Sequence, residues 1–319
     1  MNLRKGDTIG IISQSWCGPE TFPHVLESGI NNLKKMGFKV KEFSYTRKQG
    51  SPKERAQDLT NAFLDPEIKA IFCSIGGDDC TFLLKYLDIN LLKKNKKPIM
   101  GYSDPTALLS HFAQNEIPCY YGPTIMAGFS HMHFYPEWFD YITKTLKGEK
   151  LPFIAFKEYN DGYKDWSKGV IEINKKKKNP GFRFLNNLEG EGKLFGGSLE
   201  VLEFLKGTEY WPRIDFWNDK ILFLEVADNE ISITQIKYIL RNYGFINVLK
   251  RINGLIFGRA RDFSDEKKTE LDECITSVLK EFNVKIPVVT NFDVGHTDPQ
   301  FILEYGEKIK ISKGLVKRI

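Results

Sequence analysis

The sequence predicts an α/β protein with an N-terminal domain built on a doubly wound, mostly parallel sheet and a smaller C-terminal α/β domain. Short apolar runs alternate with helical stretches through the first 125 residues, and a second such block begins near residue 188. A length of 319 residues also suits two domains. We therefore expect domains at residues 1–147 and 188–319, joined by a linker and variable loop at 148–187, where little periodicity is seen.

The first expected elements are a strand, a helix and a strand. Thr8–Ile12 is a short apolar run, and residues 24–36 place apolar side chains on one helical face before Gly37, which is expected to end the helix. Lys39–Ser44 is the next expected strand.

A capping box marks the following helix. The sequence Ser-Pro-Lys-Glu at 51–54 combines an N-cap serine, a proline at the first helical position and a glutamate at the third, and it predicts a helix to about residue 64. Buried strands are expected at Ala70–Ile75 and Pro98–Tyr102, and a helix from Thr106.

The C-terminal block repeats this alternation. Lys220–Val226 is expected as a central strand, and a Ser-x-x-Gln box at Ser232 opens a helix that Gly244 is expected to close. Strand, helix and strand should follow at Gly254–Arg259, Asp265–Phe282 and Pro287–Phe292. Phe301–Tyr305 and Lys308–Ile311 flank a Gly-Glu pair and suggest a terminal hairpin.

Composition excludes several classes of protein. Apolar residues make up 41% and charged residues 27%, as in soluble globular chains, and the net charge of +5 is spread too evenly for a nucleic-acid binder. The five cysteines form no C-x-x-C pair, so neither a zinc knuckle nor a disulfide framework is indicated. No signal peptide or long apolar segment is visible, so we expect a reduced, cytoplasmic protein. The run Lys175–Lys178 is interpreted as a solvated loop, with contact to an acidic ligand as the alternative.

Two turns that follow strands could support chemistry, because ligands bind at the carboxyl ends of strands in open α/β sheets. In Gly-Tyr-Ser-Asp-Pro at 101–105, Ser103 resembles an exposed nucleophile, and the backbone N–H of Asp104 is a candidate oxyanion donor; a plain N-cap is the alternative. Gly76 and Gly77 could let a backbone N–H approach a ligand, or form a simple tight turn. Neither turn carries a dinucleotide or P-loop motif, so no nucleotide cofactor is expected.

Two further residues complete a possible catalytic set. Glu225 ends an apolar strand, where a carboxylate needs a partner such as a histidine or a structural cation. His296 lies in a glycine-containing loop after a strand, which suits a general base. Together with Ser103 they supply nucleophile, base and orienting carboxylate.

The other histidines are interpreted as structural. His24 and His111 fall in helical stretches. His131 and His133 form an H-x-H without further ligands at diagnostic spacing, so no metal site is predicted.

Several stretches resemble the LD-carboxypeptidase and microcin C immunity (MccF-like) family of serine peptidases. They are GDTIGIISQS, SIGGDDCTFLLKYLD, KKPIMGYSDPTALLSHF, YYGPTIMAGF, GKLFGGSLEVLEFLKGTEYWP, ILFLEVADNE, GLIFGRARDF and IPVVTNFDVGHTDPQFILEYG, in the family's order and across nearly the whole chain. The resemblance implies a triad of Ser103, Glu225 and His296 and an oxyanion hole from the N–H groups of Gly77 and Asp104. It also implies a cytoplasmic homodimer that needs no cofactor or metal and acts on a small substrate.

Departures from the family pattern concern the substrate pocket. Ser198 stands where the family often has Asn, Asp78 and Asp79 follow the first glycine pair where Asn is frequent, and Pro105 replaces a common aliphatic residue.

The resemblance leaves the substrate open. The immunity-type branch cleaves the amide between a peptide and a nucleotide-like group, and Trp166 in the variable loop matches the base-stacking tryptophan expected there. We favour that branch; the alternatives are a muropeptide LD-carboxypeptidase that releases terminal D-alanine, and a non-catalytic module that binds a small ligand. Arg259 and Arg261 are candidates for gripping a substrate carboxylate.

Overall fold

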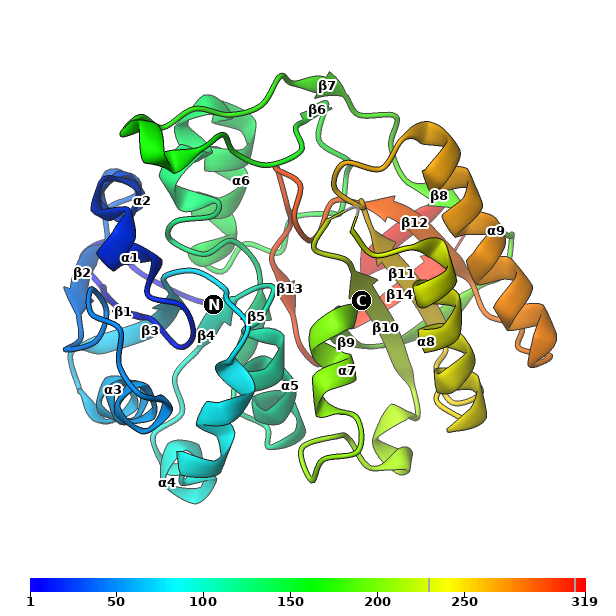
Figure 1. Cartoon of the computed structure of the whole chain (residues 1–319), viewed down its shortest axis with the longest axis horizontal. Coiled ribbons are helices and arrows are strands. Elements are labelled where there is room, and N and C mark those ends of the chain that lie inside the picture. Colours follow the sequence, from blue (N-terminus) through cyan, green and yellow to red (C-terminus); the bar gives the residue numbers. More distant parts are fainter. Residues whose placement is uncertain (229, 313) are drawn as a thin grey trace.

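The computed structural model describes residues 1–228, 230–312 and 314–319, and it confirms the α/β class, with two large sheets and a small two-stranded one in the described residues (Figure 1). The N-terminal sheet has the strand order β13 (Leu303–Glu304), β5 (Cys119–Tyr121), β4 (Ile99–Gly101), β3 (Ile68–Cys73), β1 (Thr8–Ile12) and β2 (Lys39–Glu42). Every pairing in it is parallel except that of β13 with β5. The expected parallel sheet is therefore present.

Helices connect these strands. They are α1 (Gly18–Thr21), α2 (Pro23–Lys35), α3 (Pro52–Leu64), α4 (Ile89–Lys94), α5 (Thr106–Gln114) and α6 (Pro136–Leu146), with 3-10 turns at Cys80–Tyr86 and Phe129–Phe134. Of these helices, α2, α3 and α5 are the three that the sequence predicts. The capping box between Ser51 and Glu54 forms in both directions. Gly37, with φ +99°, follows the end of α2, where only glycine readily adopts that conformation.

The C-terminal sheet is mixed. Its order is β15 (Leu315–Arg318), β14 (Lys308–Ser312), β9 (Gly190–Ser198), β10 (Lys220–Glu225), β11 (Gly254–Gly258), β12 (Val288–Phe292) and β8 (Arg183–Phe184). The four central strands are parallel, and the outer ones pair antiparallel. Its helices are α7 (Leu199–Leu205), α8 (Ile233–Phe245) and α9 (Asp265–Glu281), with a 3-10 turn at Ile214–Trp217.

The expected terminal hairpin is wrong in its first strand. β13 pairs with β5 in the N-terminal sheet, whereas β14 pairs with β9 and β15. The chain crosses between the sheets at Gly306, whose N–H donates to Leu194 O at 2.8 Å. The Gly-Glu turn suggests that β13 pairs with β14. Leu303 is instead fully buried in the N-terminal sheet, and this burial decides that β13 pairs with β5.

Gly244 does not end its helix, contrary to expectation. It lies inside α8, and a side chain there would collide with the ring of Phe282, which follows α9. This glycine therefore allows two helices to approach closely.

Residues 148–187 cross between the two halves of the molecule, along the top of Figure 1. The segment is largely irregular, as predicted, but β6 (Glu158–Tyr159) pairs with β7 (Lys177–Lys178), a 3-10 turn covers Trp166–Lys168, and β8 joins the C-terminal sheet. Three of the four residues in Lys175–Lys178 are exposed.

The two halves pack directly against each other where α5 meets β9. Gly197 has φ +143°, and a Cβ there would lie 2.6 Å from Thr106 Oγ1, so a larger residue would separate the halves. The N–H of Ser198 donates to that hydroxyl at 3.0 Å. No helix in the described ranges is long and apolar enough to cross a bilayer.

Candidate active site

Ser103 lies in the tight turn between β4 and α5, and its backbone is in the left-handed region, with φ +68°. A non-glycine residue in that region costs roughly 1–3 kcal/mol and persists only where the surroundings impose it. Its side chain is partly exposed. The turn therefore presents the hydroxyl at the carboxyl end of the sheet, as a nucleophile elbow does.

A chain of hydrogen bonds joins Ser103, His296 and Glu225. His296 Nε2 lies 3.0 Å from Ser103 Oγ, and His296 Nδ1 lies 2.7 Å from Glu225 Oε2. With the proton on Nδ1, the imidazole donates to the carboxylate and accepts from the hydroxyl. The structure thus brings together the three residues predicted from separate strand ends.

Glu225 is the last residue of β10 and is completely buried. The loop that carries His296 reaches it through Gly295, which has φ +100° and whose Cβ, if present, would lie 2.6 Å from Glu225 Oε2. Only a glycine here lets the histidine loop approach the carboxylate.

Tyr121 belongs to this site, and the sequence reasoning missed it. Its hydroxyl donates to Glu225 Oε1 at 2.6 Å and accepts the N–H of Ser103 at 3.0 Å. The fully buried Tyr121 therefore links the strained turn to the carboxylate of Glu225. Tyr121 ends β5, which pairs with β4, the strand before Ser103. The hydroxyl group at that strand end was the signal in the sequence that could have identified it.

The glycine turn after β3 lies against Ser103. A Cβ on Gly76 would be 3.3 Å from Ser103 Oγ and 3.6 Å from the nitrogen of Asp104. Gly77 has φ +150°, and a side chain on it would collide with Ser15. The N–H groups of Gly77 and Asp104 have no acceptor among the described residues, as expected of donors that await a ligand.

An ion pair that the sequence reasoning also missed fixes this glycine turn. The buried Arg55, on α3, bonds both carboxylate oxygens of Asp79 at 2.7 Å and the carbonyl of Ser15 at 2.6 Å. Ser15 Oγ donates to Asp79 Oδ1 at 2.9 Å. Asp79, one of the departures from the family pattern, therefore has a structural partner.

The electrostatics of His296 favour its protonated form. Burial acts to lower the pKa of the imidazole, but the charge and hydrogen bond of Glu225 act against burial, and the pKa is raised from its ordinary value of 6.5. Glu200 also raises it from a position beside the site, where its carboxylate accepts from Ala227 N and Ser198 Oγ, each at 3.0 Å. Burial, together with the charge of Glu225, raises the pKa of Glu200 itself.

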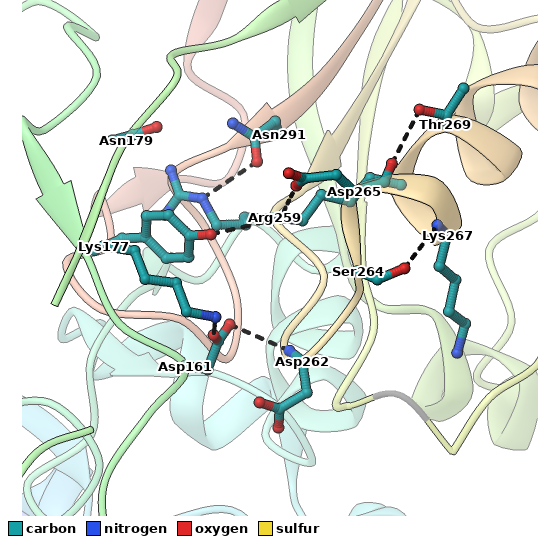
Figure 2. Close-up of polar contacts among 12 residues, drawn as sticks. Asp161, Lys177, Asn179, Arg259, Asp262, Ser264, Asp265, Lys267, Thr269 and Asn291 are labelled. Carbon is teal, nitrogen blue, oxygen red and sulfur yellow. Dashed lines mark hydrogen bonds and ion pairs between the residues drawn. The ribbon is translucent and has the colours of Figure 1, made fainter. Parts of the chain in front are cut away.

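The two arginines that were candidates for binding a substrate carboxylate, Arg259 and Arg261, differ in burial. Arg259 is fully buried and forms an ion pair with Asp293. It also donates a hydrogen bond of 3.2 Å to Asn291 (Figure 2). Arg259 is therefore a structural residue that no substrate can reach, and the prediction that it grips a substrate carboxylate is wrong. Arg261 remains 30% exposed, with one ion pair, to Asp262.

Trp166 lies in the variable segment, and its side chain is mostly buried. It stacks on Tyr163 with ring centroids 4.3 Å apart, lies edge-on to Phe22, and is 6% exposed. Asn160 and Asp298 exchange backbone hydrogen bonds, which places this part of the variable loop beside the loop of His296.

Two of the remaining histidines, His131 and His133, form hydrogen bonds within the protein. His131 is buried and lies 2.7 Å from Asp298, and His133 contacts Asn32. His24 and His111 lie on α2 and α5, as expected. Among the described residues, no three His, Cys, Asp or Glu side chains gather to hold a metal ion.

Comparisons with known proteins extend these observations to the whole chain. Residues 9–122 match the family model for the LD-carboxypeptidase N-terminal domain, and residues 191–311 match that for the LD-carboxypeptidase C-terminal domain. The microcin C7 self-immunity protein MccF of Escherichia coli is 31% identical over 97% of this chain and 91% of its own.

Solved structures show the same likeness. MccF in complex with glutamyl sulfamoyl guanosine superposes with a TM-score of 0.87 at 29% identity, covering 100% of this chain and 97% of that one. An MccF-like protein from Streptococcus pneumoniae in complex with AMP gives 0.87 at 25% identity, covering 98% and 99%.

Proposed function

Because this chain belongs to the LD-carboxypeptidase family, a family of serine peptidases, we propose that Ser103, His296 and Glu225 are its catalytic triad. The observation that carries the proposal is the unbroken hydrogen-bond chain from the Ser103 hydroxyl to Glu225, which begins at a residue in a strained turn. A module that only binds ligands has no need of such strain or of an aligned base.

The reaction begins with attack by Ser103 Oγ on the substrate's amide carbon, while its proton moves to His296 Nε2. The negative charge that develops on the carbonyl oxygen is met by the N–H groups of Gly77 and Asp104. His296 then gives the proton to the leaving nitrogen as the C–N bond breaks, which leaves an ester on Ser103. Water then attacks the ester carbon while His296 takes its proton. His296 returns this proton to Ser103 Oγ as the acyl group leaves, which restores the hydroxyl.

Glu225 fixes the imidazole and stabilises it when it becomes charged. Its Oε2 accepts the Nδ1 proton, and its Oε1 is held by Tyr121, so the carboxylate cannot rotate away. A buried, fully bonded carboxylate of this kind selects the tautomer in which Nε2 is free to accept a proton.

For the substrate, we propose the amide that joins an aminoacyl or peptidyl group to a nucleotide-like group. The support is the full-length similarity to MccF, whose structure binds an aminoacyl sulfamoyl nucleotide, and to an MccF-like protein that binds AMP. Trp166 stays a predicted substrate contact, through the small part of its ring that is exposed. The alternative, release of D-alanine from muropeptides, is supported by the family as a whole.

A product assay tests this choice. Purified enzyme is given an aminoacyl-adenylate analogue with an amide linkage and, separately, an L,D-tetrapeptide that ends in D-alanine, with products followed by mass spectrometry. Cleavage of the nucleotide substrate alone supports the proposal. Cleavage of the tetrapeptide alone assigns the enzyme to the muropeptide branch.

The pH dependence follows from the state of His296. Catalysis needs the neutral imidazole, so activity is lost as the pH falls through its pKa, and that pKa is raised above 6.5. We therefore expect the acidic limb of kcat/KM to have its midpoint above pH 6.5. A pH profile checks this, and a midpoint below that value would contradict the electrostatic account.

Tyr121→Phe should lower kcat by about 10- to 100-fold, because it removes the link between Ser103 N and Glu225 and leaves both buried groups without that partner. Tyr305→Phe is the matched control, since the hydroxyl of this buried tyrosine donates to Gly196 O at 2.7 Å and forms no hydrogen bond with Ser103 or Glu225 among the described residues. Kinetics and thermal unfolding of both variants separate positioning from stability. Equal kcat in the two variants would show that Tyr121 only stabilises the fold.

The homodimer and the cytoplasmic location implied by the family resemblance stay predictions.

A further inference from the structure

We propose that Arg261 binds an anionic group on the leaving-group side of the scissile amide. The inference rests on the proposed function and deepens it, because it names the chemistry that the substrate must carry next to the bond. That chemistry is a carboxylate or a phosphate.

Arg261 lies in the chain between Arg259 and Asp262, and both of these residues are anchored by contacts with other parts of the protein (Figure 2). Arg259, which directly follows β11, is held in the core by Asn291 and Asp293. The N–H of Asp262 donates to Asp161 at 3.2 Å, and Asp161 in turn forms an ion pair with Lys177. These contacts attach the loop to the variable segment and fix the backbone on both sides of Arg261.

The guanidinium of Arg261 lies beside the histidine loop. A Cβ on Gly162 would be 3.7 Å from Arg261 Nε and 3.8 Å from the carbonyl oxygen of His296, so both residues lie against the same glycine. The charge is also felt by the aromatic residue next to that glycine: burial raises the pKa of Tyr163 to about 12, and Arg261 acts against this rise.

The charge of Arg261 is not needed to neutralise the acids of the site. Glu225 is bonded by His296 and Tyr121, Asp298 by His131, and Glu200 by Ser198 and Ala227. Its ion pair is with the adjacent Asp262, which is 43% exposed, through Nε at 3.2 Å. Such exposed pairs are weak, and this one leaves the two terminal amino groups of the guanidinium without a partner among the described residues.

The location fits the leaving group. His296 delivers the proton to the departing nitrogen, so the leaving group lies on the side of Ser103 where His296 stands. A planar guanidinium there can bind a carboxylate or phosphate with two parallel hydrogen bonds. Terminal D-alanine carries a carboxylate next to the scissile amide, and a nucleotide-like leaving group carries a phosphate or its equivalent.

Binding to the resting protein tests this without relying on catalysis. Isothermal titration calorimetry compares AMP with adenosine, and N-acetyl-D-alanine with N-acetyl-D-alaninamide, on the wild type and on Arg261→Gln. We expect the wild type to prefer one of the anions at least about 10-fold, and the variant to lose that preference while its affinity for the neutral probe is unchanged. Preference for AMP identifies a phosphate, and preference for the acetylated amino acid identifies a carboxylate.

Arg251→Gln is the matched control, since this arginine bonds Asn218 and Asp215 at the opposite ends of the strands and should keep the preference. A wild type that prefers neither anion, or an Arg261→Gln variant that retains the preference, would overturn the inference. The triad is judged separately by Ser103-dependent hydrolysis, so one proposal can fail while the other stands.

Discussion

Ser103→Ala should lower kcat by about 10⁵-fold or more, because a triad works as a unit and the alanine variant has no group that can form the acyl-enzyme. The fold should be retained, since the Ser103 hydroxyl bonds only His296 among the described side chains and its backbone N–H contact to Tyr121 does not depend on the side chain. Steady-state kinetics with the substrate identified in the product assay give the loss in rate.

The matched control is Ser110→Ala, in α5, the helix that follows Ser103. The hydroxyl of Ser110 is buried without a hydrogen-bond partner, so its removal should leave kcat near the wild-type value. Thermal unfolding of both variants shows whether either is misfolded. Near wild-type hydrolysis by a folded Ser103→Ala protein would remove Ser103 from the mechanism.

Glu225→Gln should lower kcat/KM by about 10³- to 10⁴-fold while leaving the shape of the site unchanged. A glutamine can still accept from Tyr121, but its amide then offers an N–H toward His296 Nδ1, which forces the proton onto Nε2. In that tautomer the imidazole can no longer accept the proton of Ser103.

Glu200→Gln separates this effect from that of charge alone. Glu200 is the neighbouring carboxylate and raises the pKa of His296 without bonding its ring, so its loss should cost less than about 10-fold, the size of a Coulomb effect of about 1 kcal/mol. Comparable losses in the two variants would show that charge near His296, rather than its orientation, is what Glu225 supplies.

Much of the fold and the core of the site could be predicted from the sequence, because the signals are local. Apolar runs and capping boxes mark the strands and helices, and the topology of a parallel sheet brings their carboxyl ends together. Ser103, Glu225 and His296 each follow or end such a strand, so their meeting follows from the topology.

What the sequence could not provide are the contacts between distant elements. Arg55 on α3 and Asp79 after β3 lie 24 residues apart in the sequence and meet only through tertiary packing. Tyr121 is polar at one atom of a side chain that otherwise fits a buried strand. Arg259 and Arg261 look equivalent in the sequence, and only the packing of β12 beside β11 buries the first against Asp293. The pairing of β13 likewise depends on which sheet buries Leu303.

Activation of Ser103 by His296 and Glu225 is the step on which the proposed mechanism depends. Labelling with a fluorophosphonate, followed by peptide mass spectrometry, tests it most directly, because the reagent reacts with serines that a neighbouring base has activated. We expect one adduct, on the peptide that contains Ser103, with a labelling rate that falls steeply in His296→Gln and Glu225→Gln. An adduct on another serine, or an equal rate in these variants, would contradict the proposed mechanism.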